Sequence, residues 1–156
     1  MKKKIGFTIG KFAPLHKGHQ YLIETALNEM DEFYVVIYDT KIIDISTEVR
    51  ATWIKKLYPR CKIIYAYNPP DEYGLDEKSV KIQIDYLKNQ MSGIKVTHFY
   101  SSEEYGKFVA KEFDVIDRRI DNLREKFSIS GTEIRLNLIK NKMYLEDIVY
   151  SDCKKI

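Results

Sequence analysis

An alternation of strand-like and helix-like segments most limits what this chain can fold into. Helical patterns separate five runs of strand length: "KIGFTIG", "EFYVVIYDT", "CKIIYAY", "IKVTHFYSS" and "DVIDRR". Continuous apolar strands with helices between them are typical of βαβ units and a parallel sheet. Right-handed crossovers then give a three-layer α/β/α sandwich, in which ligands bind beyond the carboxyl ends of the strands.

Local signals place the helices between those strands. The segment "GHQYLIETALNEM" carries apolar residues at helical spacing. The next helix begins at a good N-cap, Ser46 or Thr47, and ends at Pro59. Patterns of the same kind predict three more helical segments, at 75–91, 103–113 and 128–143. The last of these starts as a loop and is expected to end as a long helix.

Composition restricts the class of protein further. With 156 residues, 44% of them hydrophobic, the chain can bury a core, and we expect a single domain over residues 1–156. A net charge of +3 without a dense basic face does not favour nucleic acid binding. No stretch approaches the roughly 18 apolar residues of a membrane span. Cys61 and Cys153 lie far apart and form no CxxC pair. A cytoplasmic protein is therefore expected.

The stretch "GKFAPLHKGH", residues 10–19, follows the first predicted strand and so falls at the binding edge. Its Gly10-Lys11 pair does not begin a P-loop. Gly6 and Gly10 enclose three residues where the P-loop pattern needs four, and Phe12 stands where that pattern has Ser or Thr. The pattern therefore argues against a P-loop kinase or ATPase.

Two of the three histidines, His16 and His19, lie where this stretch becomes a helix. Residues three apart share a helix face, and Gly18 between them lets a ligand approach the backbone closely. The helix start adds free N–H groups and the positive end of its dipole. This combination predicts a polyphosphate site. Two imidazoles could also bind a metal ion, but the sequence offers no obvious third ligand.

A second stretch, "ISGTEIR" at residues 129–135, contains a natural N-cap in Ser130. "GKFAPLHKGH" resembles the G-x-F-x-P-x-H-x-G-H signature of the nucleotidylyltransferase superfamily, and "ISGTEIR" is similar to its second motif, I-S-x-T-x-x-R. Both motifs in order, in a chain with a βαβ pattern, make the resemblance specific. It implies the HUP-type nucleotidylyltransferase fold, a Rossmann-like sandwich whose five parallel strands have the order 3-2-1-4-5.

Within the superfamily, the wording resembles nicotinamide mononucleotide (NMN) adenylyltransferases. It is similar to archaeal members and to the adenylyltransferase domain of bacterial bifunctional NMN adenylyltransferase/ribosylnicotinamide kinase proteins, including "RATWI", "YSSEEYG" and "DRR". The main enzymatic alternatives are a cytidylyltransferase and a pantetheine-phosphate adenylyltransferase, which usually have Thr-Phe-Asp and Ser-Phe-Asp in the first motif. A non-catalytic nucleotide-binding module is the alternative of another class.

The resemblance assigns roles to individual residues. It implies catalysis by four basic side chains: Lys11, His16, His19 and Arg135. It implies ATP binding by seven residues: Gly10, Phe12, Gly18, Ser102, Ser130, Gly131 and Thr132. More weakly, it implies acceptor binding by Arg50, Trp53, Asp117 and Arg119. After the third strand, the bifunctional relatives carry tryptophans where this chain has "PPDEYGLDEKS", with Tyr73 as the only aromatic residue.

The expected partners are ATP and NMN or a related phosphorylated acceptor. Mg²⁺ is expected to enter with ATP, with no metal ligands assigned to protein side chains. A homo-oligomer is possible. The bifunctional relatives continue into a kinase domain, and because this chain ends at Ile156 no kinase is expected. No DNA-reading helix-turn-helix precedes the first strand, so repressor activity is not expected either.

Overall fold

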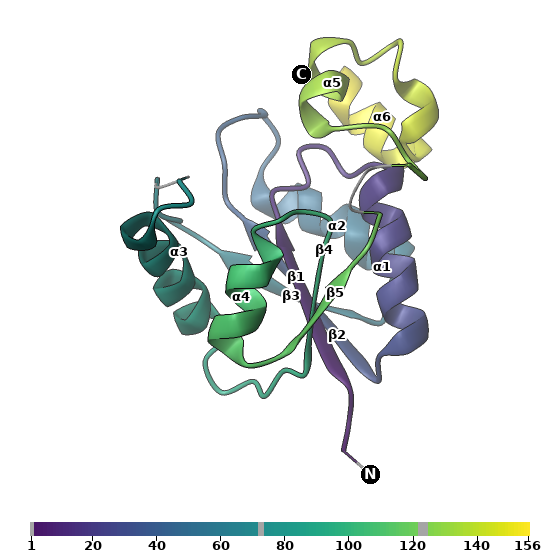
Figure 1. Cartoon of the computed structure of the whole chain (residues 1–156). Helices are drawn as coiled ribbons and strands as arrows, with labels where there is room; N and C mark the ends of the chain where they lie inside the picture. Colours follow the sequence, from purple (N-terminus) through teal and green to yellow (C-terminus); the bar gives the residue numbers. More distant parts are fainter. Residues whose placement is uncertain (1, 72–73, 122–124) are drawn as a thin grey trace.

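A single sheet of five parallel strands forms the centre of the molecule in the computed structural model, which describes residues 2–71, 74–121 and 125–156 (Figure 1). The strands are β1 (Ile5–Gly10), β2 (Glu32–Tyr38), β3 (Cys61–Ala66), β4 (His98–Ser101) and β5 (Ile116–Arg119). Their order in the sheet is β3-β2-β1-β4-β5. The predicted parallel sheet and its strand order are confirmed.

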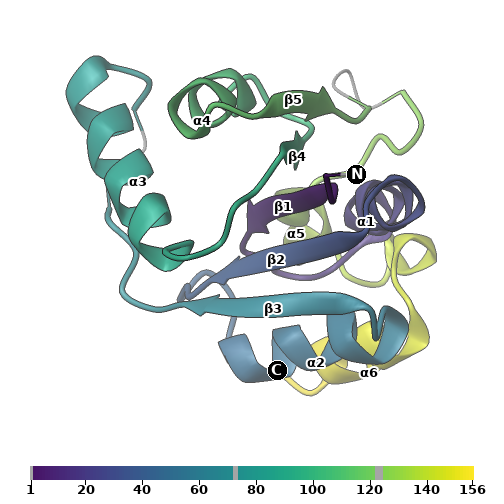
Figure 2. The same ribbon diagram turned by 90° about the horizontal axis from the view of Figure 1, so that it is seen from below.

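Helices cover both faces of this sheet, as Figure 2 shows. Those from the first half of the fold are α1 (Lys17–Glu29), α2 (Thr47–Leu57) and α3 (Glu77–Gln90), and those from the second half are α4 (Gly106–Phe113), α5 (Gly131–Leu136) and α6 (Asp147–Lys154). Helices α1 and α2 lie on one face, and α3 and α4 lie on the other. The three-layer sandwich expected from the βαβ pattern is therefore confirmed.

Two apolar clusters fill the space on either side of the sheet. Ile23 of α1 and Ile54 of α2 belong to one cluster, which also contains Val149 of α6. Val80 and Ile84 of α3 belong to the other. Apolar side chains on both faces explain why the strands appear in the sequence as continuous rather than alternating apolar runs.

The predicted helices match the observed ones closely, except near the C-terminus. Ser46 caps α2, since its hydroxyl accepts the N–H of Val49 at 3.2 Å. The predicted long helix at 128–143 is wrong, because α5 ends at Leu136. Beyond the helix, the side-chain amide of Asn141 folds back and donates to the carbonyls of Glu133 at 3.1 Å and of Asn137 at 2.9 Å, which holds the chain in a turn. The chain then forms a short 3-10 turn, η1 (Lys142–Tyr144), and the unpredicted helix α6.

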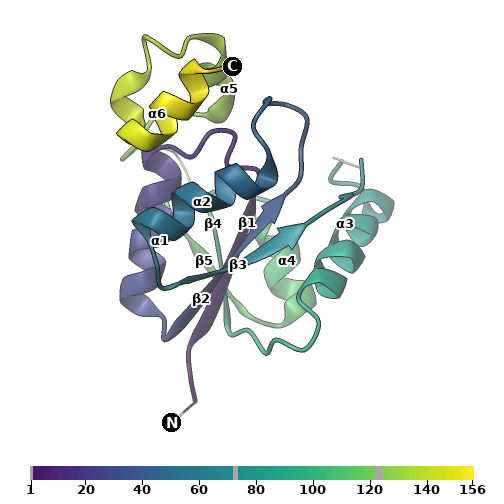
Figure 3. The same ribbon diagram turned by 180° about the vertical axis from the view of Figure 1, so that it is seen from behind.

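The C-terminal helices α5 and α6 lie beyond the carboxyl end of β1, above α1 and α2 (Figures 1 and 3). This arrangement places the second motif next to the first, although more than a hundred residues separate them in the chain. None of the described helices is long and apolar enough to cross a membrane.

Candidate active site

A cleft of about 1170 Å³ opens at the carboxyl end of the sheet. It is lined by eleven of the residues singled out in the sequence: Gly10, Lys11, Phe12, His16, Gly18, His19, Ser102, Ser130, Gly131, Thr132 and Arg135. Both motifs therefore border one cavity. Its volume is somewhat above the roughly 300–1,000 Å³ that small-molecule and cofactor sites usually occupy.

The paired histidines form the start of α1 itself. The Nδ1 atom of His16 accepts the N–H of Gly18 at 3.1 Å, and the Nδ1 atom of His19 accepts the N–H of His16 at 3.2 Å. Together these bonds make a capping box built from imidazoles. A neutral ring whose Nδ1 accepts a hydrogen bond carries its proton on Nε2. Both rings are therefore set up as Nε2–H donors.

The two imidazole rings are also fixed by packing. They stack with their centroids 3.7 Å apart, and Phe12 meets the ring of His19 edge-on at 4.8 Å. A Cβ atom on Gly18 would lie 2.9 Å from Cε1 of His16, so only glycine leaves room for that ring. His16 is 4% exposed. The histidines are thus preorganised before any ligand arrives.

Phe12 adopts a left-handed backbone conformation, with φ 48°. This conformation folds its ring back over Gly10, where an added Cβ atom would lie 3.1 Å from the aromatic ring. A side chain at Gly10 would therefore displace Phe12, which packs against His19. The "GKF" part of the first motif accordingly supports the histidines by packing as well as by its backbone.

The second motif forms a short helix opposite the histidines. Ser130 caps α5 by accepting the N–H of Glu133 at 3.2 Å, as its sequence position predicts. Arg135 donates from Nη1 to the carbonyl of Ala13 at 2.6 Å and from Nη2 to the hydroxyl of Thr132 at 3.2 Å. Because Ala13 belongs to the first motif, Arg135 ties the two motifs together across the cleft.

Arg50 and Trp53, predicted to contact the acceptor, do not reach the cleft in the described part of the chain. Both side chains are 0% exposed. Trp53 donates its indole N–H to Asp152 at 2.8 Å and so connects α2 to α6. Arg50 lies beneath the first motif, with four hydrogen-bond acceptors around its guanidinium. Burial lowers the pKa of that guanidinium, and the charge of Asp39 opposes this shift. Their predicted direct contact with an acceptor is therefore corrected to a position below the site.

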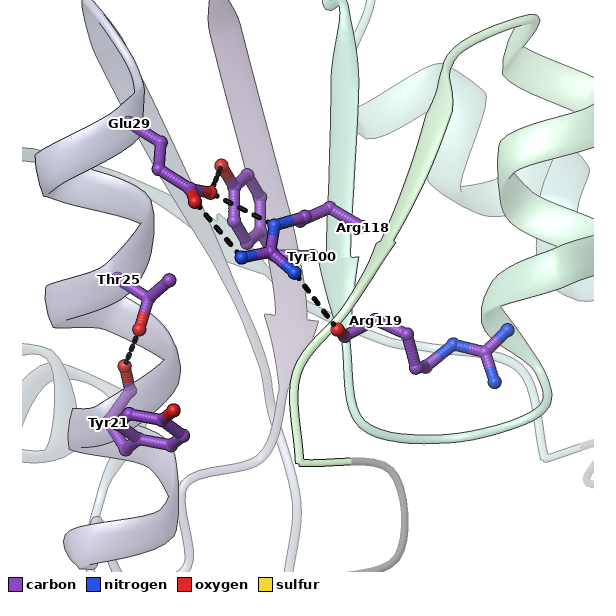
Figure 4. A network of polar contacts seen from close by, with 6 residues as sticks. All are labelled: Tyr21, Thr25, Glu29, Tyr100, Arg118 and Arg119. Atoms are coloured by element: carbon purple, nitrogen blue, oxygen red, sulfur yellow. Dashed lines mark hydrogen bonds and ion pairs between the residues drawn. The ribbon is translucent and has the colours of Figure 1, made fainter. Parts of the chain in front are cut away.

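Asp117 and Arg119 also lie outside the cleft lining, directly behind Gly106 of α4. Arg119 forms ion pairs with Asp117 at 2.8 Å and with Glu104 at 3.2 Å. The neighbouring Arg118 points the other way, toward α1, as Figure 4 shows. Asp117 and Arg119 therefore do not line the cleft, and their contact with an acceptor stays a prediction.

Figure 4 also shows what holds β5 against α1. Arg118 donates from Nε and Nη2 to the carboxylate of Glu29 at 3.1 and 3.0 Å, and the hydroxyl of Tyr100 donates to Glu29 at 2.7 Å. The hydrogen bond from Arg118 is the largest cause, and that from Tyr100 the next, of a lowered pKa at Glu29. This cluster holds the edge strand β5 against α1, and its three side chains do not line the cleft.

Several cleft residues were not singled out in the sequence. They lie at or after the carboxyl ends of the strands: Tyr38, Asp39, Lys41, Asn68, Asp71, Tyr105 and Asp121. Burial raises the pKa of Tyr105 to about 12, so its phenol stays protonated at neutral pH. The rule that ligands bind beyond strand ends could have found Asp39 and Asn68, which come at or just after predicted strands. Tyr73, the only aromatic residue in the segment after the third strand, lies outside the described residues.

Comparison with known proteins places the chain in a family. The citrate lyase ligase C-terminal domain family matches residues 6–120. A probable nicotinate-nucleotide adenylyltransferase of a Nitratiruptor species is 36% identical, with 94% of each chain covered. The trifunctional NAD biosynthesis/regulator protein NadR of Escherichia coli (strain K12) is 29% identical over 92% of this chain, which spans only 39% of that relative's length.

Solved structures share the fold. A NadR protein crystallised with NAD and AMP-PNP superimposes with a TM-score of 0.67 at 24% identity, over 94% of this chain and 46% of the other. A bifunctional NMN adenylyltransferase/ADP ribose pyrophosphatase of Francisella tularensis, complexed with AMP and a Mn ion, gives a TM-score of 0.63 at 19% identity, over 92% and 44%. These solved structures confirm the fold. The family match over residues 6–120 and the 36% identical Nitratiruptor relative show the family: the chain belongs to the nucleotidylyltransferase-like family of the citrate lyase ligase C-terminal domain.

Proposed function

We propose that the protein is an adenylyltransferase of NAD biosynthesis that joins ATP and NMN to give NAD and pyrophosphate. The observation that carries the proposal is the pair of capping imidazoles, His16 and His19, facing the second motif across a single cleft. The NadR relative is named for NAD biosynthesis and the Nitratiruptor relative for nicotinate-nucleotide adenylyl transfer, and both names support the proposal. The proposal covers residues 1–156 acting as a single domain.

In the proposed reaction, a phosphate oxygen of NMN attacks the α-phosphorus of ATP in line. The bond from that oxygen to phosphorus forms while the bond from phosphorus to the β-bridging oxygen breaks, and pyrophosphate leaves with the electron pair. The attacking phosphate is already an anion at neutral pH, so the protein needs no general base or covalent intermediate. Catalysis then consists of positioning and of stabilising charge on the transferring group.

The Nε2–H groups of His16 and His19 are assigned to oxygens around the α-phosphorus, where negative charge is redistributed in the transition state. Such preorganised donors are worth about 3–4 kcal/mol each when removed from comparable sites. Lys11 adds positive charge at the same end of the cleft. Across it, Arg135 and the start of α5, with Ser130 and Thr132, are assigned to the β- and γ-phosphates.

Divalent metal enters the proposal only with the nucleotide. Within residues 2–71, 74–121 and 125–156, no three histidine, cysteine or carboxylate side chains gather in a way that could hold a metal ion. The donor set at the motifs is instead cationic or N–H bearing, which fits phosphate oxygens. We therefore propose that Mg²⁺ binds through the triphosphate and water, and that it neutralises charge on the pyrophosphate leaving group.

The half of the cleft over the ends of β2 and β3 is assigned to the acceptor, because the second motif occupies the other half. Asp39, Lys41, Asn68 and Asp71 line it. Lys41 offers a cation that a nicotinate carboxylate could meet, and the Nitratiruptor relative is named for nicotinate nucleotide. Nicotinate mononucleotide is therefore the second candidate acceptor.

The test is an assay of purified protein with ATP, Mg²⁺ and either NMN or nicotinate mononucleotide. We expect release of pyrophosphate together with NAD from NMN, or with the deamido product from the second acceptor. Turnover of CTP with a phosphorylated alcohol, or of phosphopantetheine, would instead identify one of the alternative transferases. Tight ATP binding without turnover of any acceptor would identify a nucleotide-binding module.

A further inference from the structure

The buried guanidinium of Arg50 contacts more parts of the cleft wall than its position beneath the surface suggests. Its side chain is 0% exposed, yet it comes from α2, which does not itself line the cleft. A buried charge of this kind is costly unless every donor finds an acceptor. The positions of these hydrogen-bond acceptors therefore indicate the role of Arg50.

The acceptors belong to three different segments. Nη1 donates to the carbonyls of Lys11 and, at 3.1 Å, of Tyr38. Nε donates to the carbonyl of Ile45 at 3.2 Å, and Nη2 to the hydroxyl of Thr47 at 2.9 Å. One rigid planar group thus joins three segments: residues 11–16 between β1 and α1 (the phosphate loop), the end of β2, and the loop that leads into α2.

A second link continues from Thr47 into the acceptor half. The hydroxyl of Thr47, itself 1% exposed, donates to Oδ1 of Asp39 at 2.8 Å. Asp39 lines the cleft, as do Lys11 and Tyr38, whose carbonyls Arg50 contacts. The positions of Lys11 on the phosphate side and of Asp39 on the acceptor side are therefore both set from below by the same arginine.

We propose that Arg50 is a positioning residue. It fixes the phosphate loop relative to Asp39 in the acceptor half of the cleft, without touching either substrate. The inference rests on the proposed function, since it concerns the two substrates of that cleft. In comparable reactions a misplacement of about 1 Å can cost on the order of 100-fold in rate. Arg50 prevents such a misplacement by fixing the carbonyl of Lys11 relative to that of Tyr38.

The proposal predicts a different kinetic signature from that of an acceptor-binding arginine. A direct contact with the acceptor phosphate would raise the KM for the acceptor alone. A positioning arginine affects both halves, because Lys11 loses its anchor together with Asp39. Binding of ATP in the absence of acceptor is therefore the decisive measurement.

The experiment compares Arg50→Met with the wild-type protein by ATP titration without acceptor and by steady-state NAD formation. We expect ATP to bind about tenfold more weakly or worse, and kcat to fall by at least about tenfold. Thr47→Val, which has nearly the same shape, should leave ATP binding within about twofold and raise the KM for the acceptor by about two- to tenfold, as for one lost hydrogen bond. This second variant keeps the test intact if Arg50→Met does not fold.

Ile54→Ala is the matched control, since Ile54 is a fully buried residue of the same helix that does not line the cleft. It should lower the unfolding midpoint while leaving ATP affinity and kcat unchanged below that midpoint. Two results for a folded Arg50→Met variant would overturn the inference. One is unaltered ATP binding and kcat, and the other is a change in the KM for the acceptor alone. A wild-type protein that does not bind ATP would overturn the proposed function, and this inference with it.

Discussion

Two helix starts face each other across the cleft, and they are built in different ways. Helix α1 has 13 residues and packs Ile23 and Ala26 into the core, so its start is fixed by its own burial. Helix α5 has six residues and buries only Ile134. Besides this burial, the bond from Arg135 to the carbonyl of Ala13 ties it to the first motif. The second wall of the cleft therefore takes its place from the first.

The caps of the two helices differ in the same sense. Each imidazole at the start of α1 uses one nitrogen for the backbone and has a second nitrogen on the opposite side of the ring. At α5, the one hydroxyl of Ser130 both accepts the N–H of Glu133 and donates to its carboxylate at 3.3 Å. A histidine cap can thus hold the helix with one nitrogen and meet a phosphate with the other, whereas Ser130 would have to do both with the same hydroxyl.

The strongest way to break this comparison is His16→Asn. Asparagine is a good N-cap and can accept the N–H of Gly18, but it lacks the distant N–H of imidazole. We expect kcat to fall by about 100-fold or more, as when one oxyanion donor is lost, while the midpoint of thermal unfolding stays close to that of the wild type. Pyrophosphate release and a thermal melt measure the two quantities on the same sample.

His16→Ala provides the contrast, because it removes the cap as well. It should show the same loss in kcat together with a loss of about 1 kcal/mol in the free energy of unfolding. Full activity in the folded asparagine variant would show that the histidine serves only as a cap.

The two glycines near these helix starts sharpen the comparison at an intermediate size of effect. A Cβ atom on Gly18 would lie 2.9 Å from the ring of His16, whereas one on Gly131 would lie 3.0 Å from the end of the Arg135 side chain and 3.3 Å from the carbonyl oxygen of Ala13. The stacked ring cannot move without leaving His19, but the arginine can shift. We therefore expect Gly18→Ala to lower kcat about tenfold and Gly131→Ala to lower it less than about threefold. Equal effects in the initial-rate assay would contradict the proposed difference in rigidity.

A smaller effect is expected from Ser130→Ala, which tests the tethered helix alone. Loss of the cap should destabilise α5 by about 1 kcal/mol. Because α5 is held to the first motif by Arg135, the expected result is a few-fold rise in the KM for ATP with little change in kcat. Hydrogen exchange of the α5 amides should speed up while exchange in α1 stays unchanged. Faster exchange in both helices would mean that the two walls are not independent.

The smallest effect belongs to Glu29→Gln, in the cluster far from the cleft. The pKa of Glu29 is lowered by the hydrogen bond from Arg118, so its stabilising contribution is present above the ordinary value of 4.5 and lost as pH falls through the lower folded pKa. Both side chains are around 40% exposed, which limits that contribution to less than about 1 kcal/mol. Denaturation of wild type and variant should differ at pH 7 and converge only as the pH falls below the lowered folded pKa of Glu29. The kcat at pH 7 should be unchanged.

The sequence predicted the fold well because its signals were local and repeated. Strand-length apolar runs and the cap at Ser46 are visible over a few residues, and each agrees with the sheet that forms. The last helix was predicted too long because the bond from Asn141 back to Glu133 is a tertiary detail of a turn. Periodicity alone does not show where such a helix stops.

The sequence predicts the site residues that belong to a motif. It fails for residues whose role depends on whether the side chain is buried or faces the cleft. Both motifs line the cleft, as expected for one that follows the first strand and one that leads into the last predicted helix. Arg50 and Trp53 share a helix face that turns inward, and sequence spacing cannot tell a face that covers a ligand from one that covers the core. Asp39 carried no motif and was identified only once the ends of β2 and β1 were seen side by side.

The buried Trp53 can serve as an intrinsic fluorescence probe. It is the only tryptophan in the chain, and its indole N–H is bonded to Asp152 on the C-terminal helix. Its emission therefore reports whether α6 is docked on α2, and with it the platform on which the second motif rests. A red shift in that emission on dilution into mild denaturant, before the backbone signal is lost, would reveal undocking of the C-terminal helix as a separate event.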